Sequence, residues 1–132
     1  MRENLQRLRD AGLHLATLTN STQRVADAQM TNSGLKDFFE AILSADTVKK
    51  LKPAPEPYQM AAKSFGVGVK DIRLVAAHAW DVAGALRAGC AAAFIARPGM
   101  VLDPLAPKPD IIGKDLREVA ERIIEVESAH QP

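Results

Sequence analysis

The sequence has 132 residues, of which 47% are hydrophobic and 25% are charged, and its formal net charge is +1. This length fits about one domain, and the composition excludes a disordered, collagen-like or disulfide-scaffold protein. The near balance of charge argues against a nucleic-acid module and gives no attraction to an anionic membrane.

The sequence also bears on the compartment. The single cysteine, Cys90, cannot form an internal disulfide, which is typical of a reducing cytoplasm. The sequence contains no run of about 18 apolar residues, so it predicts no membrane span. Residues 1–4 do not begin a signal peptide. We therefore expect one cytoplasmic domain over residues 1–132, with a frayed tail from about Glu127.

Short apolar segments alternate along the chain with segments of helical periodicity. Gly12 predicts the end of a first helix, Asn20 with Gln23 resembles a capping box that opens a second, and Pro57 suits the first position of a third. The pattern predicts helices over residues 3–11, 21–32, 57–65, 81–87 and from 115, and strands over residues 13–19, 39–43, 72–76 and 91–95. Strands separated by helices predict a mostly parallel sheet with right-handed crossovers.

In such a sheet, chemistry is expected just after the carboxyl ends of the strands. Thr19 and Asn20 follow the first predicted strand, where they can cap a helix or stand beside backbone amides that bind an anion. Lys52 lies in a proline-rich loop, and a lone loop lysine is usually a solvated charge. His78, Trp80 and Asp81 follow the third predicted strand, and each taken alone has an ordinary role as a loop residue, a core residue or a helix cap. Together, polar groups at three strand ends are more than capping requires.

Other kinds of site are not indicated. No histidines or cysteines have metal-ligand spacing, and neither a phosphate-binding GxxxxGK[ST] loop nor a G-x-S-x-G elbow is present. Cys90 precedes an apolar strand, so we expect a buried structural thiol rather than a nucleophile.

Three segments, in this order, resemble the haloacid dehalogenase superfamily, and most closely its L-2-haloacid dehalogenase branch. They are Leu-Thr-Asn at residues 18–20, Lys-Pro-Ala-Pro at 52–55 followed by Tyr58, and Val-Ala-Ala-His-Ala-Trp-Asp at 75–81. The resemblance runs from about residue 5 to residue 125. It implies an α/β fold, a three-layer Rossmann-like core with a mostly parallel sheet, and the hydrolytic dehalogenation of a small 2-haloacid.

The resemblance also implies roles for the residues at the strand ends. Thr19 would hydrogen-bond the reacting group, with Asn20 beside it near the substrate carboxylate. Lys52 would hold a nucleophilic aspartate ionised by its positive charge. Asp81 would help to position the lysine and the hydrolytic water.

The segment after the third strand also distinguishes the branches of the superfamily. The phosphatases carry two acids there, four residues apart, to hold Mg²⁺. The earlier position is Ala77 in this chain, which argues against metal-assisted phosphoryl transfer and predicts no metal or cofactor. His78 stands where related dehalogenases place a polar residue against the nucleophile, and we assign His78 and Trp80 to substrate binding.

One departure from the family is large. Its nucleophilic aspartate lies on a first strand that precedes a cap domain, whereas residues 1–11 resemble the helix that leads to the second family strand. We therefore expect a truncated core without that strand, which is not catalytic alone. In the family this strand lies between those predicted here at 13–19 and 72–76, so two apolar edges would face a gap. The chain can pair them directly, accept an amino-terminal complementing segment, or form a homodimer, and we expect a dimer or larger assembly.

Three hypotheses of function follow. The first is a haloacid dehalogenase-like hydrolase core that another segment completes. The second is a non-catalytic truncated remnant that binds a partner or a small anionic or carboxylate ligand. The third and weakest is a phosphatase relative.

Overall fold

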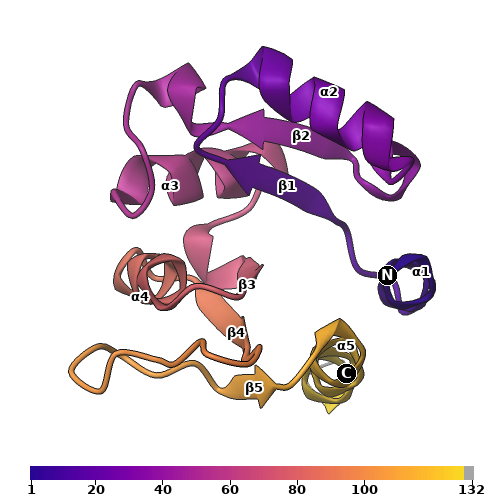
Figure 1. Cartoon of the computed structure of the whole chain (residues 1–132), viewed down its shortest axis with the longest axis vertical. Helices are drawn as coiled ribbons and strands as arrows, with labels where there is room; N and C mark the ends of the chain where they lie inside the picture. The colour runs from indigo at the N-terminus through magenta and orange to yellow at the C-terminus, as the bar shows by residue number, and fades with distance from the viewer. Residues whose placement is uncertain (130–132) are drawn as a thin grey trace.

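The computed structural model describes residues 1–129 and builds them from helices and strands that alternate along the chain (Figure 1). The helices are α1 (Arg2–Asp10), α2 (Gln23–Ser33), α3 (Pro55–Ser64), α4 (Ala79–Arg87) and α5 (Leu116–Ala129). The strands are β1 (Ala16–Thr19), β2 (Ala41–Ser44), β3 (Arg73–Ala76), β4 (Ala91–Ile95) and β5 (Ile111–Gly113). Single 3₁₀ turns cover Lys36–Phe38, Ala45–Val48 and Val69–Asp71.

The strands form the middle layer of the molecule. Helices α1 and α5 lie on one side of them, and α3 and α4 lie on the other (Figure 1). Every strand pairing is parallel, so the carboxyl ends of the strands lie at one edge of each sheet. Lys52 binds both the Leu18 carbonyl near the end of β1 and Asp81 just after β3, so these two edges lie side by side. The expected α/β architecture with a three-layer, parallel core is confirmed.

The strand layer is divided into two sheets. One sheet pairs β1 with β2, and the other has the order β3-β4-β5. Strands β1 and β3 face each other in Figure 1 but are not paired. Of the three outcomes expected for these edges, direct pairing is therefore not the one that the chain adopts.

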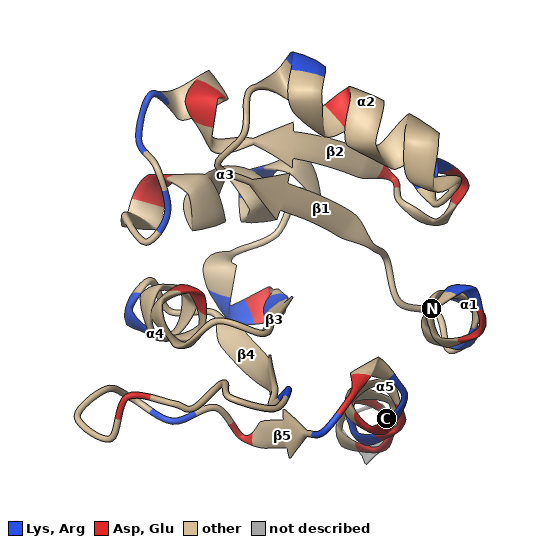
Figure 2. Cartoon of the chain, viewed as in Figure 1, with Lys and Arg blue, Asp and Glu red and all other residues tan. Residues whose placement is uncertain are grey.

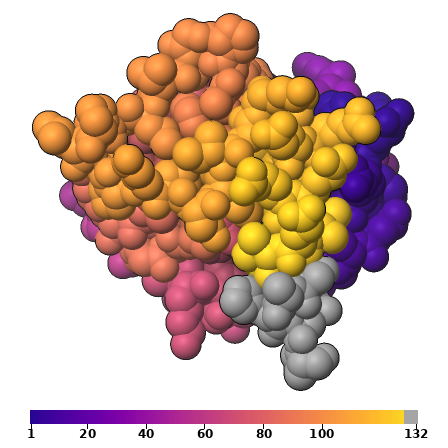
Figure 3. All heavy atoms as spheres, turned by 90° about the horizontal axis from the view of Figure 1, so that it is seen from below, coloured from indigo at the N-terminus to yellow at the C-terminus, as the bar shows by residue number. Residues whose placement is uncertain are grey.

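Three groups of apolar side chains form the core, one on the α1 and α5 side of the strand layer and two that include residues of α4. On the α1 and α5 side, Leu8 of the first helix packs with Val119 and Ile123 of the last. On the α3 and α4 side, Tyr58 and Ala85 form the centre of the second group. Figure 3 shows α1 beside α5 at the surface, so the two ends of the described chain hold the two sheets together.

Charged residues lie mainly on the helices and connecting loops rather than on the strands, as Figure 2 shows. This distribution is that of a sheet covered by helices on both faces. Within residues 1–129, no helix is both long enough and apolar enough to cross a membrane.

Several predicted element boundaries were wrong. Helix α2 is capped by Thr22, whose hydroxyl accepts a hydrogen bond from the Val25 N–H at 3.4 Å, and not by Asn20. Helix α3 begins at Pro55 rather than Pro57, because three prolines in close succession allow either start. Strand β5 was not predicted, because it is only three residues long and follows directly on the proline-rich loop.

The expected fraying of the tail from about Glu127 stays a prediction. Helix α5 continues to Ala129, and the Glu127 carboxylate lies 3.6 Å from the Arg73 guanidinium. An ion pair with a residue of β3 ties this last turn to the sheet. The rest of the expected tail, residues 130–132, lies outside the described residues.

Candidate active site

The sequence-predicted site residues gather at the carboxyl edge of the strand layer. Thr19 ends β1 and Asn20 follows it, Lys52 lies in the loop between β2 and α3, and residues 78–81 lead from β3 into α4. Because the strands are parallel, these segments meet at one edge although about 60 residues separate the first from the last.

Lys52 is a buried cation at the centre of this edge. Its side chain is only 8% exposed, and its Nζ donates to Asp81 Oδ2 at 2.7 Å and to the Leu18 carbonyl at 3.1 Å. The interpretation of Lys52 as a solvated loop charge is therefore wrong. The pair joins the loop after β2, the end of β1 and the start of α4 through a single ammonium group.

Asn20 holds the backbone of the Lys52 loop in place. Its Oδ1 accepts from the Lys52 N–H at 2.8 Å, and its Nδ2 donates to the Lys52 carbonyl at 3.2 Å. The peptide bond between Lys52 and Pro53 is cis. Asn20 therefore positions Lys52 through its side-chain amide, and its predicted contact with a substrate carboxylate stays a prediction.

Tyr58 is the site residue that sequence reasoning missed. It is 1% exposed, and its hydroxyl donates to Asp81 Oδ1 at 2.6 Å. Burial raises the pKa of the Tyr58 phenol above its ordinary value, and the hydrogen bond to Asp81 and the charge of that carboxylate raise it further. The phenol therefore stays protonated and serves as a donor. A signal existed, since a tyrosine on a buried helix face needs a polar partner.

Asp81 thus has a partner on each carboxylate oxygen, Lys52 on one and Tyr58 on the other. Its side chain is 9% exposed. A buried carboxylate held in this way is fixed in position, and it in turn fixes the direction of the Lys52 ammonium group.

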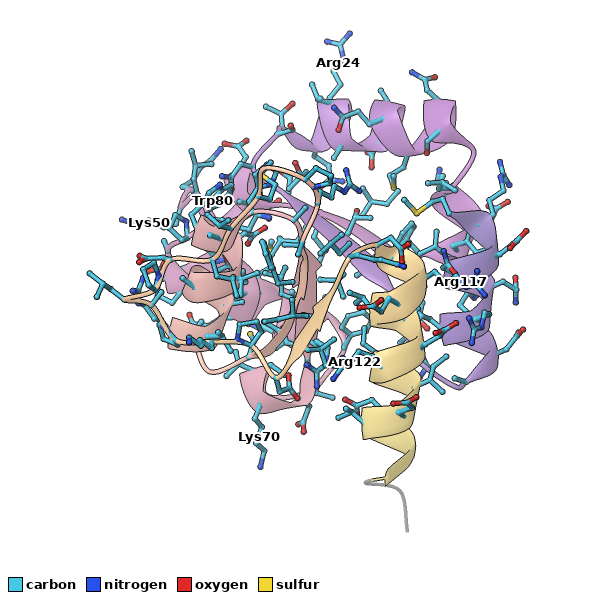
Figure 4. The ribbon with its side chains drawn as sticks, turned by 60° about the horizontal axis from the view of Figure 1, so that its bottom comes forward. Arg24, Lys50, Lys70, Trp80, Arg117 and Arg122 are labelled. Carbon is cyan, nitrogen blue, oxygen red and sulfur yellow. The ribbon has the colours of Figure 1, made fainter. Side chains whose placement is uncertain are left out.

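The remaining predicted residues lie around this pair. The Thr19 hydroxyl accepts from the Ser21 N–H at 3.1 Å. Trp80 is 47% exposed, with its ring centroid 5.7 Å from Lys52 Nζ and 6.2 Å from the ring centroid of the exposed His78. In Figure 4, Trp80 lies on the same side of the molecule as the exposed Lys50 and away from the labelled residues of α5. Trp80 therefore does not close the core.

Cys90 lies apart from this group. It is 5% exposed, and burial raises the pKa of its thiol to about 11, so the thiol is protonated at neutral pH. The expectation of a buried structural thiol is confirmed. Over residues 1–129, no three His, Cys, Asp or Glu side chains are arranged to hold a metal ion.

Comparison with known proteins gives one family and several relatives. The family model described as haloacid dehalogenase-like hydrolase matches residues 1–95. An (S)-2-haloacid dehalogenase from Pseudomonas sp. (strain YL) is 34% identical, over 90% of this chain and 51% of its own length. A phosphoglycolate phosphatase from Thiobacillus denitrificans is 39% identical over 67% of this chain and 39% of its own.

A solved structure has the same fold. The L-2-haloacid dehalogenase from Xanthobacter autotrophicus, with chloropropionic acid covalently bound, superposes with a TM-score of 0.85 and 25% identity. The match covers 92% of this chain and 58% of that one. The chain spans about half the length of the relatives that it matches.

Proposed function

Since the chain belongs to the haloacid dehalogenase-like hydrolases, we propose that it forms the lysine-bearing part of a hydrolytic 2-haloacid dehalogenase. The single observation that carries the proposal is the buried Lys52 ammonium, held by Asp81 and the Leu18 carbonyl at the carboxyl edge of the strand layer. A cation fixed there can stabilise a carboxylate that attacks a substrate.

The reaction has two steps. A carboxylate oxygen attacks C2 of the 2-haloacid, and the carbon–halogen bond breaks as halide leaves with the bonding electrons. Water then attacks the acyl carbon of the resulting ester. This step releases a 2-hydroxyacid and a proton and restores the carboxylate.

The chain's residues have separate parts in this proposal. Lys52 stabilises the nucleophilic carboxylate, and Asp81 orients Lys52 and the water. Thr19 hydrogen-bonds the reacting group, while Asn20 holds the Lys52 loop next to the substrate carboxylate. Trp80, whose exposed ring lies beside Lys52, and the exposed His78 next to Trp80 line the substrate side.

The nucleophile has to come from outside the described site. In residues 1–129, the carboxylate that contacts Lys52 is that of Asp81, and both its oxygens are already hydrogen-bonded. A carboxylate engaged in this way is a poor nucleophile. We therefore expect the 132 residues alone to release no halide above the buffer rate.

Added formate tests the proposal on the chain as it is. We expect chloride release from (S)-2-chloropropionate when formate serves as the nucleophile, with formate regenerated when the intermediate ester is hydrolysed. The rate should fall at least about tenfold in Lys52→Met, on the scale of a lost charge interaction. Lys50→Met is the matched control, since Lys50 is exposed in the same loop.

Two outcomes would contradict this proposal. Chloride release without formate would mean that a carboxylate of the chain itself acts as nucleophile. Formate-dependent release that persists in Lys52→Met would mean that the buried cation has no part in it.

The similarity to a phosphoglycolate phosphatase favours phosphate-ester hydrolysis as a second candidate function. Hydrolysis of p-nitrophenyl phosphate with Mg²⁺, measured beside the chloride assay, distinguishes the two. We expect no turnover, because Ala77 offers no oxygen ligand where the phosphatases carry an acid.

A further inference from the structure

We propose that the outer edge of β2 binds an extended, arginine-bearing segment of another protein, which adds a strand beside β2 and places its arginine in a hollow at the start of that strand. The hollow, defined by residues 27, 36, 37 and 39–42, has a volume of about 400 Å³. It lies at the amino-terminal end of β2, whereas the candidate active site lies at the carboxyl ends of the strands. The inference does not depend on the proposed function.

The edge of β2 that faces away from β1 is free. In residues 1–129, β2 pairs with β1 alone. The Glu40 N–H donates to the Leu15 carbonyl at 2.8 Å, so the backbone of Glu40 faces β1. Successive residues direct their N–H and C=O groups to opposite sides of a strand. Ala41 and Leu43 therefore direct theirs outward.

These outward backbone groups are available to a partner. Within the described residues, no hydrogen bond from a helix, a loop or a side chain reaches the backbone of Ala41 or Leu43. The Gln23 side chain donates to the Ile42 carbonyl at 2.8 Å instead. A row of open N–H and C=O groups at a sheet edge is a template on which another chain can pair.

The two outer edges of the strand layer differ in how the sequence protects them. Figure 1 shows β2 at one end of the layer and β5 at the other. Proteins commonly block an edge with lysine, proline or a very short strand, and β5 has three residues with Pro109 and Lys114 close to its two ends. Strand β2 reads Ala-Ile-Leu-Ser, without charge or proline. The contrast favours β2 as the edge that takes part in an interaction.

The hollow beside this edge carries an excess of negative charge. Among its lining residues, Asp27, Asp37 and Glu40 are carboxylates and Lys36 is the single cation. Asp27 comes from α2, and the others lie in the segment that leads into β2. A partner therefore gains from bringing a cation to the start of β2.

Two of these carboxylates remain open to such a cation. His14 binds the Glu40 carboxylate. Arg9 also reaches this region, but its guanidinium donates to the Asp37 backbone carbonyl at 3.0 Å rather than to the carboxylate. In the part of the chain that the structure describes, neither Asp27 nor Asp37 has an ion-pair partner.

An arginine side chain matches both the charge and the walls of the hollow. Phe39 and Ile42 give apolar walls on which the arginine methylenes can pack while the guanidinium reaches the carboxylates. A guanidinium binds a carboxylate through two parallel N–H donors. Because Ala41 belongs both to the open edge and to the lining, a strand paired with β2 brings its end residue to the hollow.

A second copy of this chain is a poorer occupant of the edge. Its own β2 carries no cation, and the nearest charged residues on either side of that strand are Glu40 and Asp46. Pairing two copies through β2 would thus bring carboxylates, and no arginine, toward each hollow. Charge complementarity favours a different protein with an extended basic segment.

A synthetic peptide tests this edge on the unmodified chain. The probe alternates valine and threonine between two terminal arginines, so that either direction of pairing brings one arginine to the hollow. We expect amide hydrogen exchange, followed by NMR at millimolar peptide, to slow at least about tenfold at Ala41 and Leu43. The amides of β5, on the other outer edge, should not change.

Two matched comparisons separate the charge from the strand pairing. A peptide with glutamates in place of the arginines should bind at least about tenfold more weakly. In the protein, Asp37→Asn should raise the Kd of the arginine peptide about two- to fivefold, on the scale of one exposed ion pair. Glu125→Gln removes the same charge from an exposed position of α5 and should leave the Kd unchanged.

Several results would overturn the inference. Absence of protection at Ala41 and Leu43 would mean that the edge does not pair with a strand. Equal binding of the glutamate peptide, or an unchanged Kd in Asp37→Asn, would mean that the hollow does not select an arginine. Light scattering that shows a dimer, with the Ala41 and Leu43 amides protected before any peptide is added, would assign the edge to a second copy.

Discussion

Lys52 and Asp81 carry both the chemistry and a stability cost of the candidate site. Two buried charges are expensive to remove from water, and the cost is offset only when they are paired and hydrogen-bonded. Here Lys52 also reaches the Leu18 carbonyl and Asp81 also accepts from Tyr58, so each charge has a second partner. Removing one charge alone therefore leaves the other buried without its ionic partner, whereas removing both does not.

The substitution Lys52→Met should lower the free energy of unfolding by about 3 kcal/mol, because it leaves Asp81 buried without its cation. Adding Asp81→Asn should cost much less than the two single losses combined. Urea unfolding of the four proteins of this cycle measures the coupling, with Lys50→Met expected within about 0.5 kcal/mol of the wild type. Strict additivity would mean that Lys52 and Asp81 do not stabilise each other.

At the scale of the elements, the site depends on the close approach of α4 to the loop that carries Lys52. Gly84 of α4 makes this approach possible. A Cβ atom at Gly84 would lie 2.6 Å from Pro53 Cβ and 2.9 Å from the Tyr58 hydroxyl. The loop, α3 and α4 therefore meet at a point where only hydrogen fits.

The substitution Gly84→Ala should destabilise the fold by about 1 to 3 kcal/mol through overpacking, despite the better helix propensity of alanine. It should also reduce formate-dependent chloride release, because Pro53 moves and Lys52 moves with it. Gly68→Ala is the matched control, as its nearest atom would be Asp71 Oδ2 at 3.9 Å. A Gly84→Ala protein as stable as the control would show that the contact relaxes freely.

Sequence patterns located most elements but not their limits. The alternation of apolar and helical segments predicted β4 to the residue, because an apolar run bounded by turns has few other solutions. The start of α2 was displaced because Asn20 and Thr22 are both good caps. The difference between them is that Asn20 binds the Lys52 backbone, a contact across 32 residues that no local pattern contains.

At the scale of the whole molecule, two sheets are joined by contacts outside the strands. Helix α1 packs against α5, and the Arg73 guanidinium of β3 binds both the Asp110 carboxylate before β5 and Glu127 of α5. The packing of α1 against α5 holds the two sheets together, while the Arg73 ion pairs join β3 to the end of the β3-β4-β5 sheet and to α5.

The Arg73–Asp110 pair should make this assembly sensitive to acid. The hydrogen bond from Arg73 is the main cause that lowers the pKa of Asp110 below its ordinary value of about 3.9. A lowered folded-state pKa gives stability that is complete above the unfolded pKa and is lost as the pH falls through the folded pKa. The stability advantage of the wild type over Asp110→Asn should therefore shrink below about pH 4.

Urea unfolding between about pH 2.5 and pH 7 measures this difference. Asp71→Asn is the control, since Asp71 is an exposed aspartate for which the described structure gives no ion pair. A constant difference between the wild type and Asp110→Asn across this range would mean that Arg73 does not favour the charged form of Asp110.

The sequence by itself determined the class of fold, the parallel sense of the strands and the edge at which polar residues gather. These follow from local periodicity and from the rule that parallel strands end together. Tertiary structure alone decided that Lys52 is buried, that Tyr58 binds Asp81 and that β1 and β3 are not paired with each other. The reason is that burial and pairing depend on residues that are distant in the chain, and a local sequence pattern does not show which distant residues come into contact.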